Sequence, residues 1–323
     1  MHLFSLTFNI KKKINFDKWM IENKPITNVK ILFDKYLFIN NEEHLKIIDI
    51  KNLDFIKLKI YSKGNFKRVG KGKFGNIFLH HKKKFVIKQI LKEDTLLEIE
   101  ILKKINHIFI ISMKDYFENS IYSFIIFEYL QIDLFEIINK FKLKHEDIIF
   151  YMSEVICAIE YLHNLDIIYM DLKPENIMIQ NDGHIKLIDF GLSIFKDKIL
   201  DIGGTTIYMS PEVLKFLIYD TDKYLINEIS DLWCIGILLF ELTYQNVHEI
   251  TYKKNEKELL EIYKNELWWI KPFNIDIIDL LSILLKNKVD ERATIEEIKN
   301  HILFEKLNWD HVIQKKYNVP KFK

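Results

Sequence analysis

The spacing of apolar residues along the chain changes near residue 130. Before that point, short apolar runs separated by turn residues predict strands, and one segment with helical spacing predicts a helix at 95–105. The predicted strands are 66–69, 77–81, 85–90 and 123–129. Beyond residue 130 the spacing is helical over 134–141, 145–164, 228–244, 257–265, 275–286 and 294–302. The pattern predicts an α+β protein with a small β-rich lobe followed by a larger helical lobe.

Residues 1–60 lie outside this pattern. Residues 18–22 predict a short amphipathic helix, whereas 29–39 and 45–60 have the alternation expected of strands. The segment either packs on the small lobe or provides a docking surface, and the sequence leaves both interpretations open.

The composition is that of an ordinary soluble globular protein. Of the 323 residues, 49% are hydrophobic and 29% are charged, which is enough to build one large core or two lobes. The net charge of +1 argues against a protein held mainly by nucleic-acid phosphates, so no direct nucleic-acid binding is predicted. The longest apolar run, Leu232–Leu242, is too short for a membrane span, and no membrane contact is predicted.

The N-terminus and the cysteines favour an intracellular protein. The basic run at 11–13 follows the first apolar stretch, whereas a secretory signal has its charges first. Cys157 and Cys234 lie in apolar helical patterns and are predicted to be buried reduced thiols, as in a reducing compartment. The abundance of lysine, isoleucine and asparagine indicates an A+T-rich genome, such as that of a parasite or a large DNA virus. We therefore expect the protein in the cytoplasm or nucleus, in a host cell if it is viral.

Two motifs in the helical half have the order and spacing of a phosphoryl-transfer site. The first, YMDLKPEN, spans residues 169–176, and the second, DFG, begins at Asp189. Moving a γ-phosphate needs a base near the acceptor hydroxyl, a cation on the transferring oxygens and ligands for the metal. Asp171 is predicted to be the base and Lys173 the cation, with Asn176 and Asp189 as ligands of Mg²⁺.

A glycine-rich loop lies between two predicted strands. The pattern G-x-G-x-x-G is a weak signal alone, because dinucleotide-binding folds share it. Those folds need a helix directly after the loop, whereas residues 76–79 have a strand pattern. The loop is therefore predicted to be a lid over the phosphates of ATP. The nucleotide-binding residues predicted here are Gly70, Lys71, Gly72, Lys73, Phe74, Gly75 and Ile77.

The next strand carries Lys88, which is predicted to pair with the α- and β-phosphates. Its expected partner is Glu98, one helical turn before Ile101, with Glu100 as the alternative. Only a short connection separates Lys88 from Glu98, and it should limit how far the helix can swing outward. The hinge is expected at 127–130.

Within that hinge, the backbone of Glu128 and Leu130 is predicted to hold the adenine edge, while Asp133 would meet the ribose or a cation of the substrate. With the phosphate and metal assignments, this makes ATP and Mg²⁺ the expected cofactors.

The chain resembles eukaryotic-type protein kinases, and specifically the AGC group that includes cyclic-AMP-dependent kinase, from about residue 64 to the end. Lys173 and Thr205, which would support the base, imply a serine/threonine kinase. Tyr169 at the start of the catalytic loop and the motifs HILF, NWD and PKF within 301–322 imply the group.

The resemblance implies a two-lobed protein-kinase fold. The kinase domain is expected at 64–304, with lobes at 64–130 and 131–304. An extension at 1–63 would precede it, and a short AGC-like tail at 305–323 would follow. Such a tail usually continues to a hydrophobic motif. Here we expect the N-terminal extension or a partner to replace that motif, or the short connection before Glu98 to make it unnecessary.

Three further motifs have structural roles in this family. Ser-Pro-Glu at 210–212 resembles the end of an activation segment, and Arg292 matches the arginine that pairs with its glutamate, Glu212. Asp231 resembles the aspartate of a buried helix that holds the catalytic loop. The resemblance therefore implies a buried pair between Glu212 and Arg292.

Two departures from the family fit together. Met170 stands where most such kinases have an arginine that grips a phosphate on the activation segment. Asp201 aligns with the residue that is usually phosphorylated, so a carboxylate is already present. We predict activity without phosphorylation of the activation segment.

The expected substrate is a protein with basic residues near the target hydroxyl. In AGC kinases, acids at positions like those of Glu175, Asp133 and Glu261 attract such residues, although ordinary solvated acids are an alternative reading. A kinase-fold scaffold without catalysis is the competing functional class, and a small-molecule kinase is a third. Scaffolds typically lose the lysine, the base or a metal ligand, and all are present here.

Overall fold

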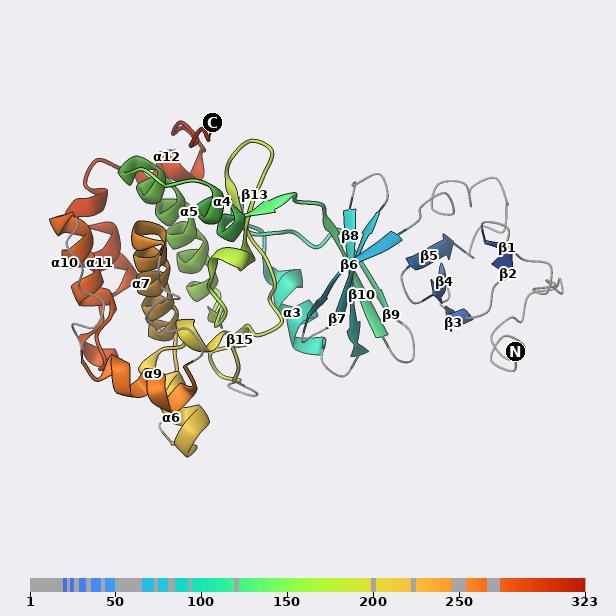
Figure 1. Ribbon diagram of the computed structural model, residues 1–323, viewed down its shortest axis with the longest axis horizontal. Helices are drawn as coiled ribbons and strands as arrows, with labels where there is room; N and C mark the ends of the chain where they lie inside the picture. Colours follow the sequence, from blue (N-terminus) through green and yellow to red (C-terminus); the bar gives the residue numbers. More distant parts are fainter. Residues whose placement is uncertain are drawn as a thin grey trace. The chain divides into compact units, whose positions relative to one another are not determined.

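The computed structural model describes residues 20–21, 24–25, 29–32, 36–41, 44–49, 66–72, 75–80, 85–92, 95–118, 122–198, 202–221, 225–245, 254–265 and 274–322. Its contacts divide the chain into two compact units (Figure 1). The first unit comprises Met1–Leu96 and Met113–Tyr129, and the second comprises Leu97–Ser112 and Leu130–Lys323. The first is rich in strands and the second in helices, which confirms the predicted α+β class. The predicted boundaries of extension, lobes and tail stay predictions.

The first unit contains an antiparallel sheet of eight strands. Their order in space is β3 (Val29–Leu32), β4 (Tyr36–Asn41), β5 (His44–Asp49), β6 (Phe66–Gly72), β7 (Gly75–His80), β8 (Phe85–Leu91), β10 (Tyr122–Glu128) and β9 (Asp115–Glu118). The central strands carry the buried side chains of Phe78, Ile87, Phe124 and Ile125. All four strands predicted between residues 66 and 129 are therefore present, and β9 adds one that the pattern did not show.

The amphipathic helix predicted at 18–22 is wrong. Met20–Ile21 forms strand β1 and pairs with β2 (Lys24–Pro25), in the register Met20↔Pro25 and Ile21↔Lys24. Proline lacks an N–H and its ring clashes with the preceding helical turn, so a helix cannot continue through Pro25. The predicted strands further on are confirmed in part by β3, β4 and β5.

The second unit is built from helices with small sheets at their edges. The helices are α3 (Leu96–Lys104), whose first residue belongs to the first unit, α4 (Leu134–Lys140), α5 (His145–His163), α6 (Pro211–Tyr219), α7 (Ile229–Tyr244), α9 (Glu256–Tyr263), α10 (Ile275–Leu284), α11 (Ile295–Lys299) and α12 (Trp309–Ile313). Short 3₁₀ turns lie at Pro174–Asn176, Thr206–Tyr208, Val289–Glu291 and Ile302–Phe304. Across the described part of the chain, no helix combines the length and apolar character needed to cross a bilayer.

Two small sheets frame the segments between these helices. One has the order β11 (Ile132–Asp133), β13 (Ile177–Ile179) and β14 (Ile185–Leu187), and the other pairs β12 (Ile167–Ile168) with β15 (Ile194–Phe195). These strands are two or three residues long, too short to show a period in the sequence.

Helix α7 forms the centre of the second unit, where it packs against both α5 and α10 (Figure 1). Its side chains are buried from Ser230 to Thr243, including Cys234. Gly236 permits the close approach of α10, because a Cβ at this position would lie 2.7 Å from Leu285 Cδ2. The two predicted buried thiols are confirmed, since Cys157 is also buried and neither cysteine forms a disulfide.

The tail beyond residue 304 packs along the second unit. Trp309 Nε1 donates to the carbonyl oxygen of Lys299 at 3.2 Å, and Lys315 Nζ lies 2.9 Å from a carboxylate oxygen of Asp182. Further on, the ring of Phe322 stacks on that of Phe141, with centroids 5.1 Å apart. The tail therefore joins α11, the β13–β14 hairpin and the end of α4.

A buried ion pair joins the start of α6 to the segment before α11, as predicted. Arg292 Nη1 and Nη2 contact Glu212 Oε1 and Oε2 at 2.9 and 3.0 Å, a bidentate arrangement. Ser230 Oγ also donates to Glu212, and Arg292 lies 5.3 Å from the ring centroid of Trp233. Burial alone would raise the pKa of Glu212, but the charge and hydrogen bonds of Arg292 outweigh it and lower that pKa.

We predict that Arg292→Leu lowers the free energy of unfolding by about 3–5 kcal/mol at pH 7, because it leaves the Glu212 carboxylate buried without its cation. The difference from wild type should be full at neutral pH. This difference should shrink as the pH falls below about 4.3, the ordinary pKa of a glutamate in the unfolded chain. It should keep shrinking until the pH reaches the lower pKa that Glu212 has in the folded protein. Urea denaturation followed by tryptophan fluorescence measures it.

Lys264→Gln is the control, because it removes an exposed pair with Glu261 that solvent screens, and it should leave stability almost unchanged. Equal losses in the two variants would contradict the structural role given to Arg292.

Candidate active site

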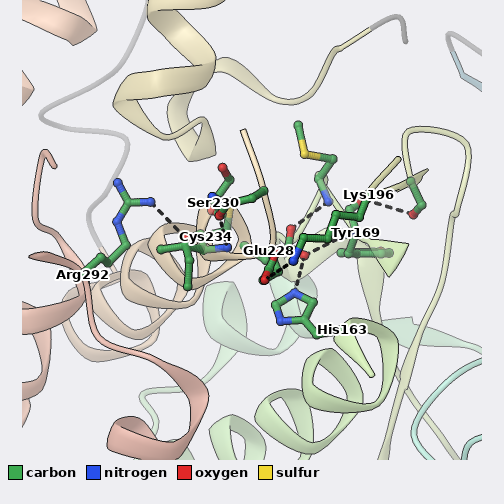
Figure 2. A network of polar contacts seen from close by, with 12 residues as sticks. His163, Tyr169, Lys196, Glu228, Ser230, Cys234 and Arg292 are labelled. Carbon is green, nitrogen blue, oxygen red and sulfur yellow. Dashed lines mark hydrogen bonds and ion pairs between the residues drawn. The ribbon is translucent and has the colours of Figure 1, made fainter. Parts of the chain in front are cut away.

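The segment leading into the YMDLKPEN motif is held by one buried carboxylate. Asp231 is fully buried in the first turn of α7. Its carboxylate accepts hydrogen bonds from Tyr169 N at 2.8 Å and from Met170 N at 2.9 Å, and it lies 2.9 Å from His163 Nε2 (Figure 2). Met170 adopts φ 70°, a conformation that costs free energy for a residue with a side chain. The hydrogen bonds to Asp231 stabilise that turn, and they confirm the role that the resemblance implied.

Asp171, directly after this turn, lies at the centre of a polar cluster. Its Oδ2 accepts from Lys173 Nζ at 2.7 Å and from Asn176 Nδ2 at 2.8 Å. Its Oδ1 is 3.3 Å from Thr205 N and 3.2 Å from Thr205 Oγ1. Lys173 Nζ also contacts Thr205 Oγ1 at 2.6 Å. The predicted base and cation therefore lie together, and the predicted supporting threonine joins them.

This cluster has the features of a proton acceptor held in one orientation. The hydrogen bonds prevent the Asp171 carboxylate from rotating, and the ammonium group of Lys173 supplies one positive charge beside it. A positioned carboxylate can take the proton of an acceptor hydroxyl, while a nearby ammonium stabilises charge that develops on phosphoryl oxygens.

Asn176 and Asp189 are brought to one end of a hairpin. Asn176 precedes β13 and Asp189 follows β14, whose register includes Ile177↔Leu187. Ile188 N donates to the carbonyl oxygen of Asn176 at 2.9 Å, which continues the pairing by one residue. Asp189 has φ 57°, another strained backbone conformation of the kind that clusters at functional sites.

The donor set at this end fits Mg²⁺. Asn176 Nδ2 donates to both the carbonyl oxygen and the carboxylate of Asp171, which leaves the amide oxygen on the opposite side of its side chain. Among the residues that the structure describes, no cluster of three His, Cys, Asp or Glu side chains could hold a metal alone. One amide oxygen and one carboxylate suit Mg²⁺, which usually keeps water and phosphate oxygens as its other ligands.

The first unit contains the glycine-rich turn. Gly70, Lys71 and Gly72 end β6, Gly75 opens β7, and Gly72 pairs with Gly75. Lys73 and Phe74 lie outside the described residues. The predicted strand after the loop is confirmed, which argues against a dinucleotide-binding fold, and the role of the loop as a lid over phosphates stays a prediction.

Gly75 shows why this turn needs glycine. Its φ is 141°, and a Cβ there would lie 1.9 Å from the carbonyl oxygen of Gln89 on β8. No other residue fits without moving the backbone.

Lys88 lies on β8, opposite Ile77 on β7. Ile77 in turn pairs with Gly70, so these three predicted nucleotide-binding residues occupy adjacent strands at one level of the sheet. The side chain of Lys88 is buried, as expected of an ammonium group that binds an internal anion rather than water.

The two candidate partners of Lys88 differ in their surroundings. Glu98 is only 3% exposed, whereas Glu100 points to solvent and lies 3.8 Å from Lys198 and 4.0 Å from Lys104. Burial favours Glu98 for an internal role. Phe127, the first residue of the predicted hinge, is buried near the end of β10.

The predicted hinge residues and the other predicted acids lie in separate elements. Glu128 ends β10, and Leu130 begins the second unit. Asp133 caps α4, with Oδ1 accepting from Glu136 N at 2.7 Å. Glu261 is an exposed residue of α9, 2.5 Å from Lys264. Asp201 lies outside the described residues.

The sequence interpretation named Glu175 as an acid that would attract basic residues, but it missed the neighbouring acid Glu241. Glu241 is buried in α7 and accepts a hydrogen bond from the hydroxyl of Tyr208. Burial raises the pKa of Glu241 to about 7; the Tyr208 hydrogen bond opposes this, and the negative charge of Glu175 adds to it. Within the described residues, Glu175 Oε2 is buried without a hydrogen-bond partner. The sequence did contain one signal for Glu241, because an acidic residue inside the apolar run of α7 would be buried and would need a partner.

Comparisons with known proteins agree with this geometry. A family model described as the protein kinase domain matches residues 64–304. The chain is 31% identical to cAMP-dependent protein kinase type 3 of Saccharomyces cerevisiae over 285 residues, which cover 80% of this chain and 69% of the yeast protein.

Two further relatives have a similar identity. The chain is 31% identical to ribosomal protein S6 kinase alpha-3 of Mus musculus, with 79% of this chain and 37% of the relative covered. It is 33% identical to serine/threonine-protein kinase Sgk1-A of Xenopus laevis, with 79% and 62% covered. The chain thus spans less than two thirds of these two relatives. The family match over most of the chain shows that it belongs to the protein kinases, with the ATP-dependent serine/threonine kinases of the AGC group as its relatives.

Proposed function

We propose that this chain is an active serine/threonine kinase that transfers the γ-phosphate of ATP to hydroxyls of proteins with nearby basic residues. The observation that carries the proposal is the cluster around Asp171, in which Lys173, Asn176 and Thr205 hold both carboxylate oxygens. A scaffold without catalysis has no need of a carboxylate held by three partners.

Each predicted residue has a place in this reaction. Asp171 takes the proton of the acceptor hydroxyl, and Lys173 stabilises charge on the transferring oxygens. Mg²⁺, held by Asn176 and Asp189, would neutralise charge on the phosphates of ATP.

The other predicted residues would bind or orient ATP itself. The glycine-rich turn and Lys88 would bind its phosphates, with Glu98 orienting the lysine. The backbone of Glu128 and Leu130 would bind the adenine. Asp133, as a helix cap, has one carboxylate oxygen engaged by its own helix and would offer the other to the ribose.

The acidic pair of Glu175 and Glu241 supports a basic substrate. The charge of Glu175 raises the pKa of Glu241, so a cation nearby is needed to stabilise the charged form of Glu241. An arginine side chain of the substrate would supply five donors and one charge, enough to satisfy Glu175 Oε2. The exposed Glu261, already paired with Lys264, has no comparable need of a cation.

We also propose that activity does not require phosphorylation of the activation segment. The Thr205 hydroxyl is used by Asp171 and Lys173, so a phosphate on it would break the cluster rather than complete it. Met170 cannot bind a phosphate, because a thioether is neutral and apolar. An intracellular location, supported by the two buried free cysteines, belongs to the same proposal.

For the base, we predict that Asp171→Asn lowers kcat by about 10²–10⁴-fold, because the amide cannot accept the proton. Phosphate transfer from labelled ATP to a serine peptide containing arginine measures it, and Asp310→Asn, an exposed change in α12, is the control. A scaffold would show no transfer above background in either protein.

For the acidic pair, we predict that KM for the arginine peptide falls about 5- to 10-fold as the pH rises from 6 to 8. Glu241 holds its proton up to about pH 7 in the free protein, and only the charged form binds a guanidinium. The same raised pKa means that the carboxyl lowers folding stability as the pH rises from about 4.3 through 7.

Glu241→Gln should raise KM for this peptide about 10-fold and abolish its pH dependence, whereas Glu305→Gln should change neither. A peptide with glutamine in place of arginine controls for titration elsewhere. The assignment fails if both peptides show the same pH profile.

For activation, we expect phosphatase-treated protein to keep at least about half of its kcat, since the cluster around Asp171 is formed by unmodified side chains. Mass spectrometry checks that the segment is free of phosphate. Protein that stays inactive until a kinase modifies Thr205 or Thr206 would contradict this expectation.

A further inference from the structure

A second cluster joins α3 to β15, within the second unit. Phe195, 5% exposed, lies with its ring centroid 4.3 Å from Lys104 Nζ and 5.4 Å from Lys198 Nζ. Glu100 lies 4.0 Å from Lys104 and 3.8 Å from Lys198. We call Glu100, Lys104, Phe195 and Lys198 the α3 clamp.

The attractions within the clamp offset the repulsion between its two lysines. Two ammonium groups near one ring repel each other, but the negative face of the ring attracts both. Glu100, within 4.0 Å of each lysine, reduces the repulsion between them. Two contacts cross from α3 to the segment after the DFG motif: Lys104 over the ring of Phe195, and Glu100 with Lys198. They resist separation of the two elements.

The segment that carries Phe195 is itself firmly attached. Phe195 pairs with Ile167 on β12, and Lys196 N donates to the carbonyl oxygen of Asp166 at 2.8 Å. Lys196 Nζ lies 2.6 Å from Glu228 at the start of α7, a contact drawn in Figure 2. Through β12, the clamp is therefore connected to the turn that precedes Asp171.

Glu98 lies on the same short helix as Glu100 and Lys104, with its side chain buried. Movement of α3 away from β15 would carry Glu98 with it. A contact that fixes the exposed side of α3 thus also limits where Glu98 can be.

We propose that the α3 clamp positions Glu98, and that it makes phosphorylation of the activation segment unnecessary. The inference rests on the proposed kinase function. It adds the residues that hold the helix: a phosphate would link α3 to the segment through charge, whereas the clamp makes the link with side chains already present. Its members are positioning residues, since none is assigned a contact with ATP or substrate.

The expected effect is moderate. Only the contact between Lys104 and Phe195 crosses from α3 to β15. One cation–ring contact at an exposed site changes an equilibrium by about 2- to 5-fold, so losing it should favour opening of α3 by about that factor. The exposed ion pairs of Glu100 add less.

The test uses the full chain and the variant Lys104→Gln with Lys198→Gln, which changes two exposed side chains and should not impair folding. Hydrogen exchange of the α3 amides should become about 2- to 5-fold faster. The kcat should fall by no more than the same factor, with KM for the arginine peptide unchanged. Lys140→Gln, which removes an exposed pair with Glu136 in α4, is the matched control and should change none of these quantities.

Variants of the ring make the test specific. Phe195→Leu should reproduce the double lysine change, whereas Phe195→Tyr keeps an aromatic face and should behave as wild type. The effects of Lys104→Gln and Phe195→Leu should not add, because both remove the same contact. If the leucine variant fails to fold, the lysine variants alone decide.

The outcomes separate the two proposals. Wild-type exchange rates in the double lysine variant would overturn the clamp, as would faster exchange with an unchanged kcat in an active enzyme. A third outcome is faster exchange in the double lysine variant together with no phosphate transfer by the wild-type protein. That outcome would support the role of the clamp in holding α3 and would overturn the kinase proposal instead.

Discussion

The carboxylate of Asp231 is the interaction on which the candidate site depends. It is fully buried, and the backbone N–H groups of Tyr169 and Met170 and the ring of His163 hydrogen-bond to it. A buried carboxylate without donors would cost several kcal/mol, so the donors must stay where they are. Their positions require the turn at Met170 with its positive φ, and that turn sets the direction of Asp171. The cluster of Asp171, Lys173, Asn176 and Thr205 is built outward from this point.

Buried charge in the second unit follows two different patterns. Glu212 with Arg292, and Glu154 with His184, have partners for both carboxylate oxygens and join distant segments. Glu175 and Glu241 instead place two acids near each other, and the hydroxyl of Tyr208 donates to Glu241. Paired acids join parts of the fold: Arg292 lowers the pKa of Glu212, whereas burial raises that of Glu154 despite its partners. Two neighbouring acids instead favour a ligand of opposite charge. The difference between the patterns therefore separates structural acids from candidate binding acids.

Much of the fold was predictable because its main elements are long and amphipathic. The strands β6, β7, β8 and β10 and the helices α3, α4, α5, α7, α9 and α10 all fall within a few residues of the predicted ranges. The strands β11 to β15 were not predicted, since two or three residues contain no period and their pairing depends on distant segments. Helix α6 was missed, although Pro211 at its first turn is a recognised start signal. At residues 18–22, the apolar spacing suggested a helix, but Pro25 and the pairing with β2 produced a strand.

The parts of the candidate site that one motif places in a single loop could be predicted from the sequence. The parts that form by contact between distant segments could not. Asp171, Lys173 and Asn176 lie within six residues of one another, so one loop conformation determines their arrangement. Asp189 follows from the β-hairpin that a short spacing implies. Glu241 and Glu175 come from separate elements, and the shift in the pKa of Glu241 depends on burial that no local pattern reports. The α3 clamp is a further case, because Lys104 and Phe195 meet only when α3 packs beside β15. Exposed lysines are common and individually uninformative, so contacts of this type become visible only once the fold has placed an aromatic ring beneath them.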